Sequence, residues 1–188
     1  LMNVMQKDIS NSLASITLAL ESEDSETSHY AAAVLSDELN RFRLYVQKLR
    51  RQICEEEAEE TECEEMLLDY MDNILKQHIF SDHEQRKFVH IMEETAESLY
   101  EKDHSRITLK QYESVCLRIM EMKEFEASGK WCMRMAEQYP GELLSYTCKL
   151  KYYFASQNRE AFFTALDELK KSDVVIDSET LELIRIVI

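Results

Sequence analysis

Glycine and proline are nearly missing from this chain, which has 2 Gly and 1 Pro among 188 residues. Tight hairpin turns, phosphate-binding loops and nucleophile elbows need residues that tolerate a positive φ, usually glycines. A fold rich in hairpins or centred on a glycine-rich nucleotide loop is therefore excluded. We expect an all-α fold of long helices and short polar connections, with one core or two small ones.

Basic residues and long apolar runs are also scarce. The chain has 22 Lys+Arg against 37 Asp+Glu, a formal charge of −15, so its average surface repels nucleic-acid phosphates. Its one basic cluster consists of Arg41, Arg43, Lys48, Arg50 and Arg51. No apolar run approaches the roughly 20 residues of a membrane span, and no signal-peptide pattern opens the chain. The sequence predicts a soluble protein without membrane insertion or direct nucleic-acid binding.

The cysteines form an odd set without CxxC spacing: Cys54, Cys63, Cys116, Cys132 and Cys148. Such a set fits buried thiols in a reducing compartment better than a disulfide framework, so we predict a cytoplasmic location. Because the chain starts on Leu1 and ends on Val187 and Ile188, we expect both ends to have been cut from a longer protein.

Apolar periodicity predicts two helices in residues 1–57, over 3–20 and 27–57. The second helix carries an unbroken seam with steps of four and three: Leu35, Leu39, Phe42, Val46, Leu49 and Ile53. Such a seam needs a partner helix, and the short connection makes 3–20 the nearest one, packed antiparallel. Additional apolar positions favour a four-helix homodimer of two such hairpins, with these six residues as the dimer seam.

Eight glutamates follow between Cys54 and Glu65. This run lacks the glycine turn and alternating oxygen ligands of a calcium loop, so we interpret 58–65 as an acidic linker or helix extension. It separates residues 1–57 from a second module over 66–188.

The second module shows helical periodicity throughout. The expected helices span 66–80, 82–102, 108–122, 124–139, 142–156, 159–171 and 178–187. Ser81 with Glu84, and Thr108 with Gln111, have the spacing of capping boxes. An offset of 34 residues aligns the segment that begins at Lys123 with the one that begins at Gln157, and paired helices at this period indicate a stacked helical repeat.

The stretch KEFEASGKWCMRMAEQYP, from Lys123 to Pro140, resembles the second helix of a tetratricopeptide repeat, including the proline that ends it. Ser128 occupies the small-residue position where the two helices of such a repeat cross. Met135 stands where a second small residue is usual, and the next copy has Phe162 and Leu169 at its two small positions. The resemblance implies a tetratricopeptide-like α-solenoid with one fair and one degenerate repeat.

The N-terminal module resembles a different family. KDISNSLASI (Lys7 to Ile16) followed by VLSDELNRFRLYVQKLRR (Val34 to Arg51) is similar to the dimerisation and phosphoacceptor hairpin of sensor histidine kinases. Lys7 stands in the place of the phosphorylated His and Ser12 in the place of the proline, so the resemblance implies dimerisation geometry without the chemistry. The repeat arrangement over about 108–171, which ends in a short acidic connection and a final helix with the sequence DSETLELIRI, also resembles the helical domain attached to some bacterial transcriptional activators.

The sequence offers no clear chemical site. His83 and His90 lie two helical turns apart, while His78 and Asp82 flank a helix junction beside His83. We predict no metal, no cofactor and no catalytic residue. Cys116, Cys132 and Cys148, spaced by sixteen, are expected as buried thiols on three successive helices, a spacing that we attribute to the repeat length. No pair among 37 acids stands out, so we predict that the protein is not an enzyme.

Stacked helix pairs form a concave surface that is lined by the first helix of each pair. The expected partner-binding groove consists of Tyr112, Arg118, Lys149, Tyr152 and Tyr153. Aromatic and basic side chains suit an extended peptide. The alternative is that the last helix of the chain fills this groove.

These patterns support three hypotheses of function. The first is a non-enzymatic interaction module of a larger protein, which docks a protein or peptide through the tetratricopeptide-like groove. The second is the dimerisation and relay region of a bacterial signalling or transcription regulator. The third is a catalytic or metal-dependent helical domain.

Overall fold

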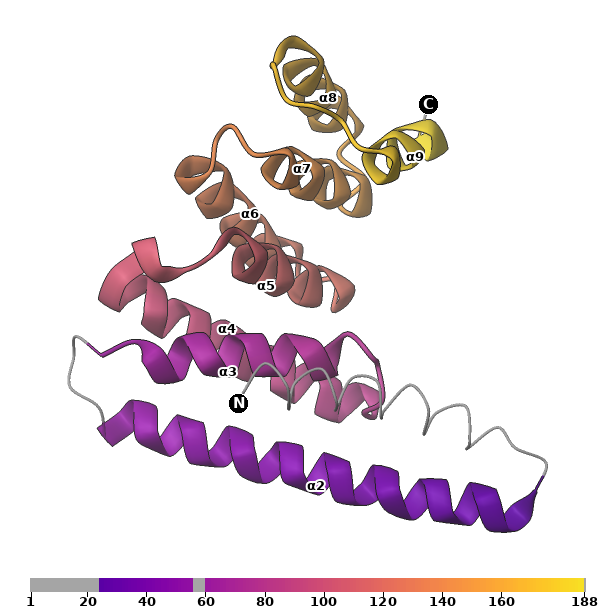
Figure 1. Ribbon diagram of the computed structural model, residues 1–188. Helices are drawn as coiled ribbons and strands as arrows, with labels where there is room; N and C mark the ends of the chain where they lie inside the picture. The colour runs from indigo at the N-terminus through magenta and orange to yellow at the C-terminus, as the bar shows by residue number, and fades with distance from the viewer. Residues whose placement is uncertain (1–23, 56–59, 188) are drawn as a thin grey trace. The chain divides into compact units, whose positions relative to one another are not determined.

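The computed structural model describes residues 24–55 and 60–187. These residues form eight α-helices and one short 3-10 helix and contain no strand, which confirms the predicted all-α class (Figure 1). The helices are α2 (Ser25–Glu55), α3 (Glu62–Leu75), α4 (Asp82–Asp103), η1 (His104–Arg106), α5 (Leu109–Glu121), α6 (Phe125–Gln138), α7 (Leu143–Ala155), α8 (Arg159–Lys171) and α9 (Ser178–Val187). The predicted helix 3–20, with its Lys7–Ile16 motif, lies outside the described residues.

The chain divides into two compact units, residues 1–106 and 107–188. The predicted boundary at 58–65 differs from this division, because α3 packs on α2 and α4 packs on α3. Helices α3 and α4 therefore belong to the first unit, and the second unit holds α5 to α9. None of the described helices is long and apolar enough to cross a bilayer.

The core of the first unit centres on Phe42, which is 1 % exposed. Its ring lies 4.9 Å from the ring of Phe88, 5.2 Å from that of Phe80 and 5.5 Å from that of Tyr70, measured between centroids. These rings come from α2, α3, α4 and the connection before α4, so one aromatic side chain joins the whole unit. Offset and tilted aromatic pairs of this kind add to the stabilisation from burial alone.

The acidic run continues into α3 rather than ending before it. Three of its glutamates fall in the first turn of α3, where carboxylates interact favourably with the helix dipole. Glu64 is fully buried, with an oxygen 2.7 Å from the Lys102 Nζ, and an oxygen of Glu65 lies 2.7 Å from the Arg106 Nε. This end of the run therefore contributes to the packing of the first unit, although its charge suggests a solvated segment.

Only one predicted capping box is complete. At Thr108 the hydroxyl accepts from the Gln111 N–H, and the Gln111 side chain accepts from the Thr108 N–H. Ser81 also caps α4, with its hydroxyl accepting from the Glu84 N–H. The Glu84 carboxylate binds Arg43 of α2 instead of the Ser81 backbone, because a guanidinium lies within reach.

The second unit contains a structural repeat of the predicted length. Helix α5 spans 109–121 and α7 spans 143–155, so both bounds differ by 34 residues. The residue pair at that offset, Lys123 and Gln157, follows these helices with φ values of 63° and 58°. The two helices end with equivalent backbone hydrogen bonds, because the N–H groups of Lys123 and Gln157 each donate to the carbonyl three residues earlier. Consecutive helices from α5 to α8 pack on one another, as in a solenoid.

Small residues allow the helices of the second unit to approach closely. The buried Ser128 hydroxyl of α6 donates to the Cys116 carbonyl of α5 over 3.1 Å. The next residue, Gly129, faces α7: a Cβ built there would lie 2.5 Å from the Tyr152 hydroxyl. The predicted crossing position at Ser128 is therefore used, and its neighbour Gly129 extends the close contact to a third helix.

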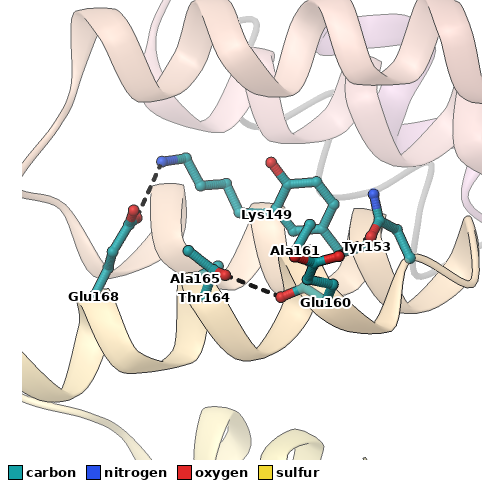
Figure 2. Close-up of a pocket in the computed structure, with 8 residues that line it drawn as sticks. Lys149, Tyr153, Glu160, Ala161, Thr164, Ala165 and Glu168 are labelled. Carbon is teal, nitrogen blue, oxygen red and sulfur yellow. Dashed lines mark hydrogen bonds and ion pairs between the residues drawn. The ribbon is translucent and has the colours of Figure 1, made fainter.

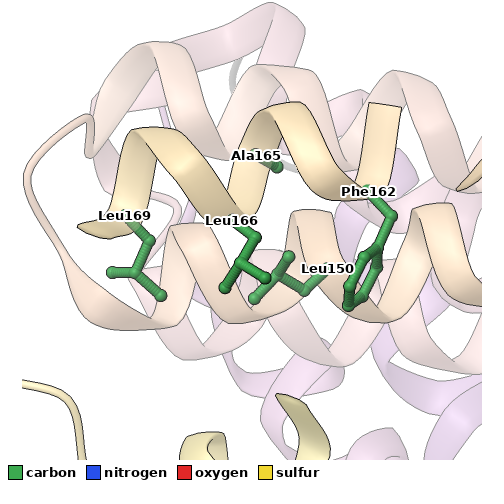
Figure 3. Close-up of a cluster of buried hydrophobic side chains, with 5 residues drawn as sticks. All are labelled: Leu150, Phe162, Ala165, Leu166 and Leu169. Carbon is green, nitrogen blue, oxygen red and sulfur yellow. The ribbon is translucent and has the colours of Figure 1, made fainter. Parts of the chain in front are cut away.

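Helix α8 packs on α7 through an apolar cluster (Figure 3). Leu150 of α7 faces the α8 residues Phe162, Ala165, Leu166 and Leu169, all at most 3 % exposed. Leu183 and Ile184 of α9 pack against the same cluster and are partly buried. Helix α9 thus covers part of the apolar cluster that α7 and α8 share.

Candidate functional site

Two of the predicted groove residues line a pocket between α7 and α8 (Figure 2). Lys149 and Tyr153 lie one helical turn apart on α7. The other side consists of Asn158, Glu160, Ala161, Thr164, Ala165 and Glu168. This α7–α8 pocket has a volume of about 340 Å³.

The rim of the α7–α8 pocket carries charges of both signs. The Lys149 Nζ lies 3.8 Å from a Glu168 carboxylate oxygen on the facing helix. The Asn158 side chain accepts from the Ala161 N–H and so caps α8. Burial raises the pKa of Tyr153 above its ordinary value of 10.0. The pocket therefore offers one ammonium, two carboxylates and a small apolar floor.

The two helix pairs differ in side-chain volume near this pocket. Ala165 stands 34 residues after Trp131, a fully buried residue whose ring lies 6.0 Å from that of Tyr112. Since alanine is much smaller than tryptophan, the last helix pair has less side-chain volume at this position.

A second depression occupies the equivalent place in the preceding repeat. It has a volume of about 560 Å³ and lies against Glu124, Phe125, Glu126, Ala127 and Lys130 at the start of α6. Four of these positions, moved by 34 residues, are the pocket residues Asn158, Glu160, Ala161 and Thr164. The two depressions therefore share four positions of the repeat, whereas their lysines come from different helices, Lys149 from α7 and Lys130 from α6.

Three of the five predicted groove residues do not line this pocket. Tyr112 is a core residue: it is fully buried, and its hydroxyl donates to the Gln138 side chain. Arg118 is 9 % exposed, and its guanidinium binds Glu121 one turn later on α5. Tyr152 packs over Gly129 of α6. The prediction of Tyr112 as a partner-facing residue is wrong, because the bulky ring is needed against Trp131.

The predicted dimer seam is partly occupied within the chain. Phe42, Val46 and Leu49 are 1 %, 1 % and 2 % exposed, and the Phe42 ring contacts rings from α3 and α4. The remaining seam residues, Leu35, Leu39 and Ile53, are half-buried. The seam therefore finds a partner in α3 and α4, which the periodicity of α2 alone could not identify.

The structure brings together three cysteines from three helices. The Sγ atoms of Cys116 (α5), Cys132 (α6) and Cys148 (α7) all lie within 4.8 Å of one another, and those of Cys116 and Cys148 are 3.3 Å apart. All three residues are at most 1 % exposed. Sequence reasoning placed them on successive helices but missed their convergence.

Hydrogen bonding makes the three thiols unequal. Bonds from the Cys132 and Cys148 thiols lower the pKa of Cys116, and the same bonds raise the pKa values of the two donors. The even spacing does not follow the repeat, since Cys148 lies 148 − 116 = 32 residues after Cys116 and not 34. The signal that could have revealed the cluster was the placement of one thiol on each of three consecutive helices.

The candidate set at the α3–α4 junction does not converge in the same way. The ligand atoms of His78, Asp82 and His83 do not come within 4.8 Å of one another as a group of three. His78 instead adopts a left-handed conformation, with φ of 50°, after the end of α3.

The basic cluster of α2 is partly paired within the first unit. Arg43 binds Glu84 and Arg50 binds Glu94, both on α4, while Arg41 binds Glu38 on α2 itself.

No family model, no curated protein and no solved structure matches this chain.

Proposed function

We propose that this chain is a non-enzymatic protein–protein interaction module, and that its second unit docks an extended peptide. The observation that carries the proposal is the pair of equivalent depressions in successive helix pairs, one against α6 and one between α7 and α8. Stacked helical pairs offer an extended chain similar contacts at each repeat. Two depressions at positions related by 34 residues favour a partner that is itself extended.

The charge of the depressions indicates the chemistry of the partner. Glu160 and Glu168 border the α7–α8 pocket, and Glu124 and Glu126 border the other depression, each set against one lysine. The whole chain carries −15. Complementary charge speeds association and excludes wrong partners. The partner is therefore a peptide segment with basic residues around an apolar side chain that fits over Ala161.

A peptide selection tests this proposal. Random peptides displayed on phage are selected on the wild-type chain, and each enriched peptide is then titrated against Ala161→Trp, which fills the pocket, and Glu160→Lys, which reverses its rim. We expect basic peptides with an apolar centre and at least a tenfold loss of affinity in both variants. Glu137→Lys, on an exposed position of α6, is the matched charge control and should lose much less.

Two results would contradict the proposal: no sequence preference among the selected peptides, or equal affinity for the wild type and both pocket variants. Far-ultraviolet circular dichroism of each variant separates lost binding from lost folding.

A second candidate is a dimerisation and relay region of a signalling or transcription regulator, formed through α2. This 31-residue helix leaves Tyr30 75 % and Leu44 66 % exposed, although both are large and apolar. A second copy of the helix would cover them. Sedimentation of the wild type should then show a dimer, and Leu44→Lys should shift it toward monomer. A monomer at all concentrations would exclude this candidate.

A further inference from the structure

The three-cysteine cluster consists of Cys116, Cys132 and Cys148. If each of these cysteines only filled a space between two helices, the three sulfurs would not need to lie together. Here three thiols from α5, α6 and α7 occupy the same small volume, with their sulfurs within 4.8 Å of one another. We propose that this cluster is a three-thiolate binding site for a soft metal ion, with Cu(I) as the ion that it fits.

The geometry fits a shared ion. Three sulfurs at a metal–sulfur distance of about 2.3 Å stand about 3.8 to 4.0 Å from one another around a tetrahedral or planar centre. The sulfurs of this cluster lie at up to 4.8 Å, with the Cys116–Cys148 pair at 3.3 Å. Shifts of a fraction of an ångström, within the reach of side-chain rotation, would bring all three into bonding distance.

The ligand set favours Cu(I) over zinc. Soft thiolates select Cu(I) and Zn²⁺, but structural zinc sites are completed by a fourth N, S or O ligand. Among the described residues no further Cys, His, Asp or Glu atom joins the three sulfurs. The nearby Ser128 hydroxyl is occupied as a donor to the Cys116 carbonyl. Three sulfurs without a fourth ligand suit an ion that accepts trigonal coordination, as Cu(I) does.

The surroundings supply positive charge for the thiolates. The Cys132 and Cys148 thiols lower the pKa of Cys116, and Lys151 adds a smaller effect in the same direction. The pKa of Cys132 is raised by its bond to Cys116 and by burial, and Lys149 opposes this rise. Both lysines are on α7, beside Cys148. Charges of this sign offset the net negative charge that three thiolates and one monovalent ion would place in a dry interior.

The binding step balances without an oxidant. Each thiol that binds loses its S–H bond, its proton leaves to solvent, and its sulfur lone pair forms the bond to copper. The copper stays in the +1 state and no sulfur is oxidised. Full coordination by three neutral thiols releases three protons, so the apparent affinity rises with pH.

A competition titration tests the site. The reduced full chain is mixed without oxygen with Cu(I) held by bicinchoninate, a chromophoric Cu(I) chelator. We expect the wild type to withdraw one equivalent of Cu(I), and Cys132→Ala to weaken that binding at least a hundredfold. Cys54→Ala removes an exposed thiol instead and should bind as the wild type does.

A second measurement does not depend on the variants folding. X-ray absorption of the copper-loaded wild type should show three sulfur neighbours in one shell. The proposal is overturned if bicinchoninate retains all the copper, if Cys54→Ala and Cys132→Ala lose equal affinity, or if two sulfurs are found. Tighter retention of Zn²⁺ with a fourth ligand would overturn the assignment to Cu(I). A Cys116–Cys148 disulfide with no copper uptake after reduction would overturn the site itself.

Discussion

The two units of this protein both bury large rings, Phe42 in the first and Tyr112 with Trp131 in the second, but their helices meet in different ways. The first unit joins α2, α3 and α4 through large overlapping rings around Phe42, with ion pairs from α2 to α4 at its edge. The second unit brings α5, α6 and α7 together through Ser128, Gly129 and three cysteines. Large rings fill wide spaces between helices, whereas small residues allow the helix backbones to approach closely.

These two kinds of packing predict which substitutions each unit tolerates. A core of overlapping rings loses stability when volume is removed, since the surrounding side chains relax only partly. A core of close helix crossings loses stability when volume is added, since backbone must move.

Removing the central ring of the first unit should have the largest effect. We expect Phe42→Ala to lower the free energy of unfolding by about 3–5 kcal/mol, because it deletes a fully buried ring with three aromatic neighbours. Urea denaturation followed by circular dichroism measures the change. Leu44→Ala, at a residue that is 66 % exposed on the same helix, should stay within about 0.5 kcal/mol of the wild type. Similar losses in both variants would contradict the packing around Phe42.

Adding volume at the crossing of α6 and α7 should have the next largest effect. Gly129→Leu should cost about 1–3 kcal/mol, because even a Cβ would meet the Tyr152 ring. Tyr152→Ala in the same chain should recover part of that loss. Gly141→Ala is the matched control, since no atom lies within 4 Å of its built Cβ. A Gly129→Leu chain as stable as Gly141→Ala would show that the helices are not closely packed there.

Replacing left-handed residues with glycine should stabilise both units by a smaller amount. Gln157→Gly and His78→Gly should each raise the free energy of unfolding by about 0.5–1 kcal/mol, since glycine adopts a positive φ without a Cβ clash. Asp167→Gly, within the exposed face of α8, should instead lower it by about 0.5 kcal/mol. A loss of stability in Gln157→Gly would contradict its left-handed conformation.

The ion pairs of the first unit should contribute least. Arg43 binds both Glu84 oxygens, at 2.7 and 3.0 Å, and this hydrogen bonding lowers the pKa of Glu84 from its ordinary value of 4.5. A double-mutant cycle with Arg43→Met and Glu84→Gln should give a coupling of about 0.5 kcal/mol at neutral pH. The more exposed Arg50–Glu94 pair is the control and should couple less.

The coupling should also depend on pH in one direction. Because folding lowers the Glu84 pKa, the stabilisation is present above the pKa of the unfolded chain and is lost as pH falls through that of the folded chain. The cycle repeated below pH 4.5 should therefore give a smaller coupling. A coupling that stays constant across this range would exclude the carboxylate of Glu84 as its source.

Local patterns predicted the helices well. The expected 108–122 and 159–171 compare with 109–121 and 159–171 in the structure, and the 34-residue offset reappears in α5 and α7. Helix periodicity and capping are properties of a few neighbouring residues, so sequence shows them directly. The start of α3 was misplaced because an acidic run looks solvated until Lys102 and Arg106, about forty positions later, are seen to pair with it.

The candidate sites could be predicted only in part. Lys149 and Tyr153, which the sequence assigned to a partner-binding groove, line one pocket, since residues four apart share a helix face. Tyr112 was misassigned because an amphipathic tyrosine has no local mark of burial, and its depth depends on Trp131 of the next helix. The cysteines were assigned to separate spaces between helices. The sequence shows on which helix each cysteine lies, but not how each helix is rotated about its axis.

The sequence by itself determined that the chain is helical, where most of its helices begin and end, and that its last helices repeat after 34 residues, since all of these depend on interactions within a few turns. Tertiary structure decided which faces meet. It placed Phe42 in the core of the first unit and directed three thiols to one point, because these outcomes depend on helix rotations that residues far apart in the chain set together.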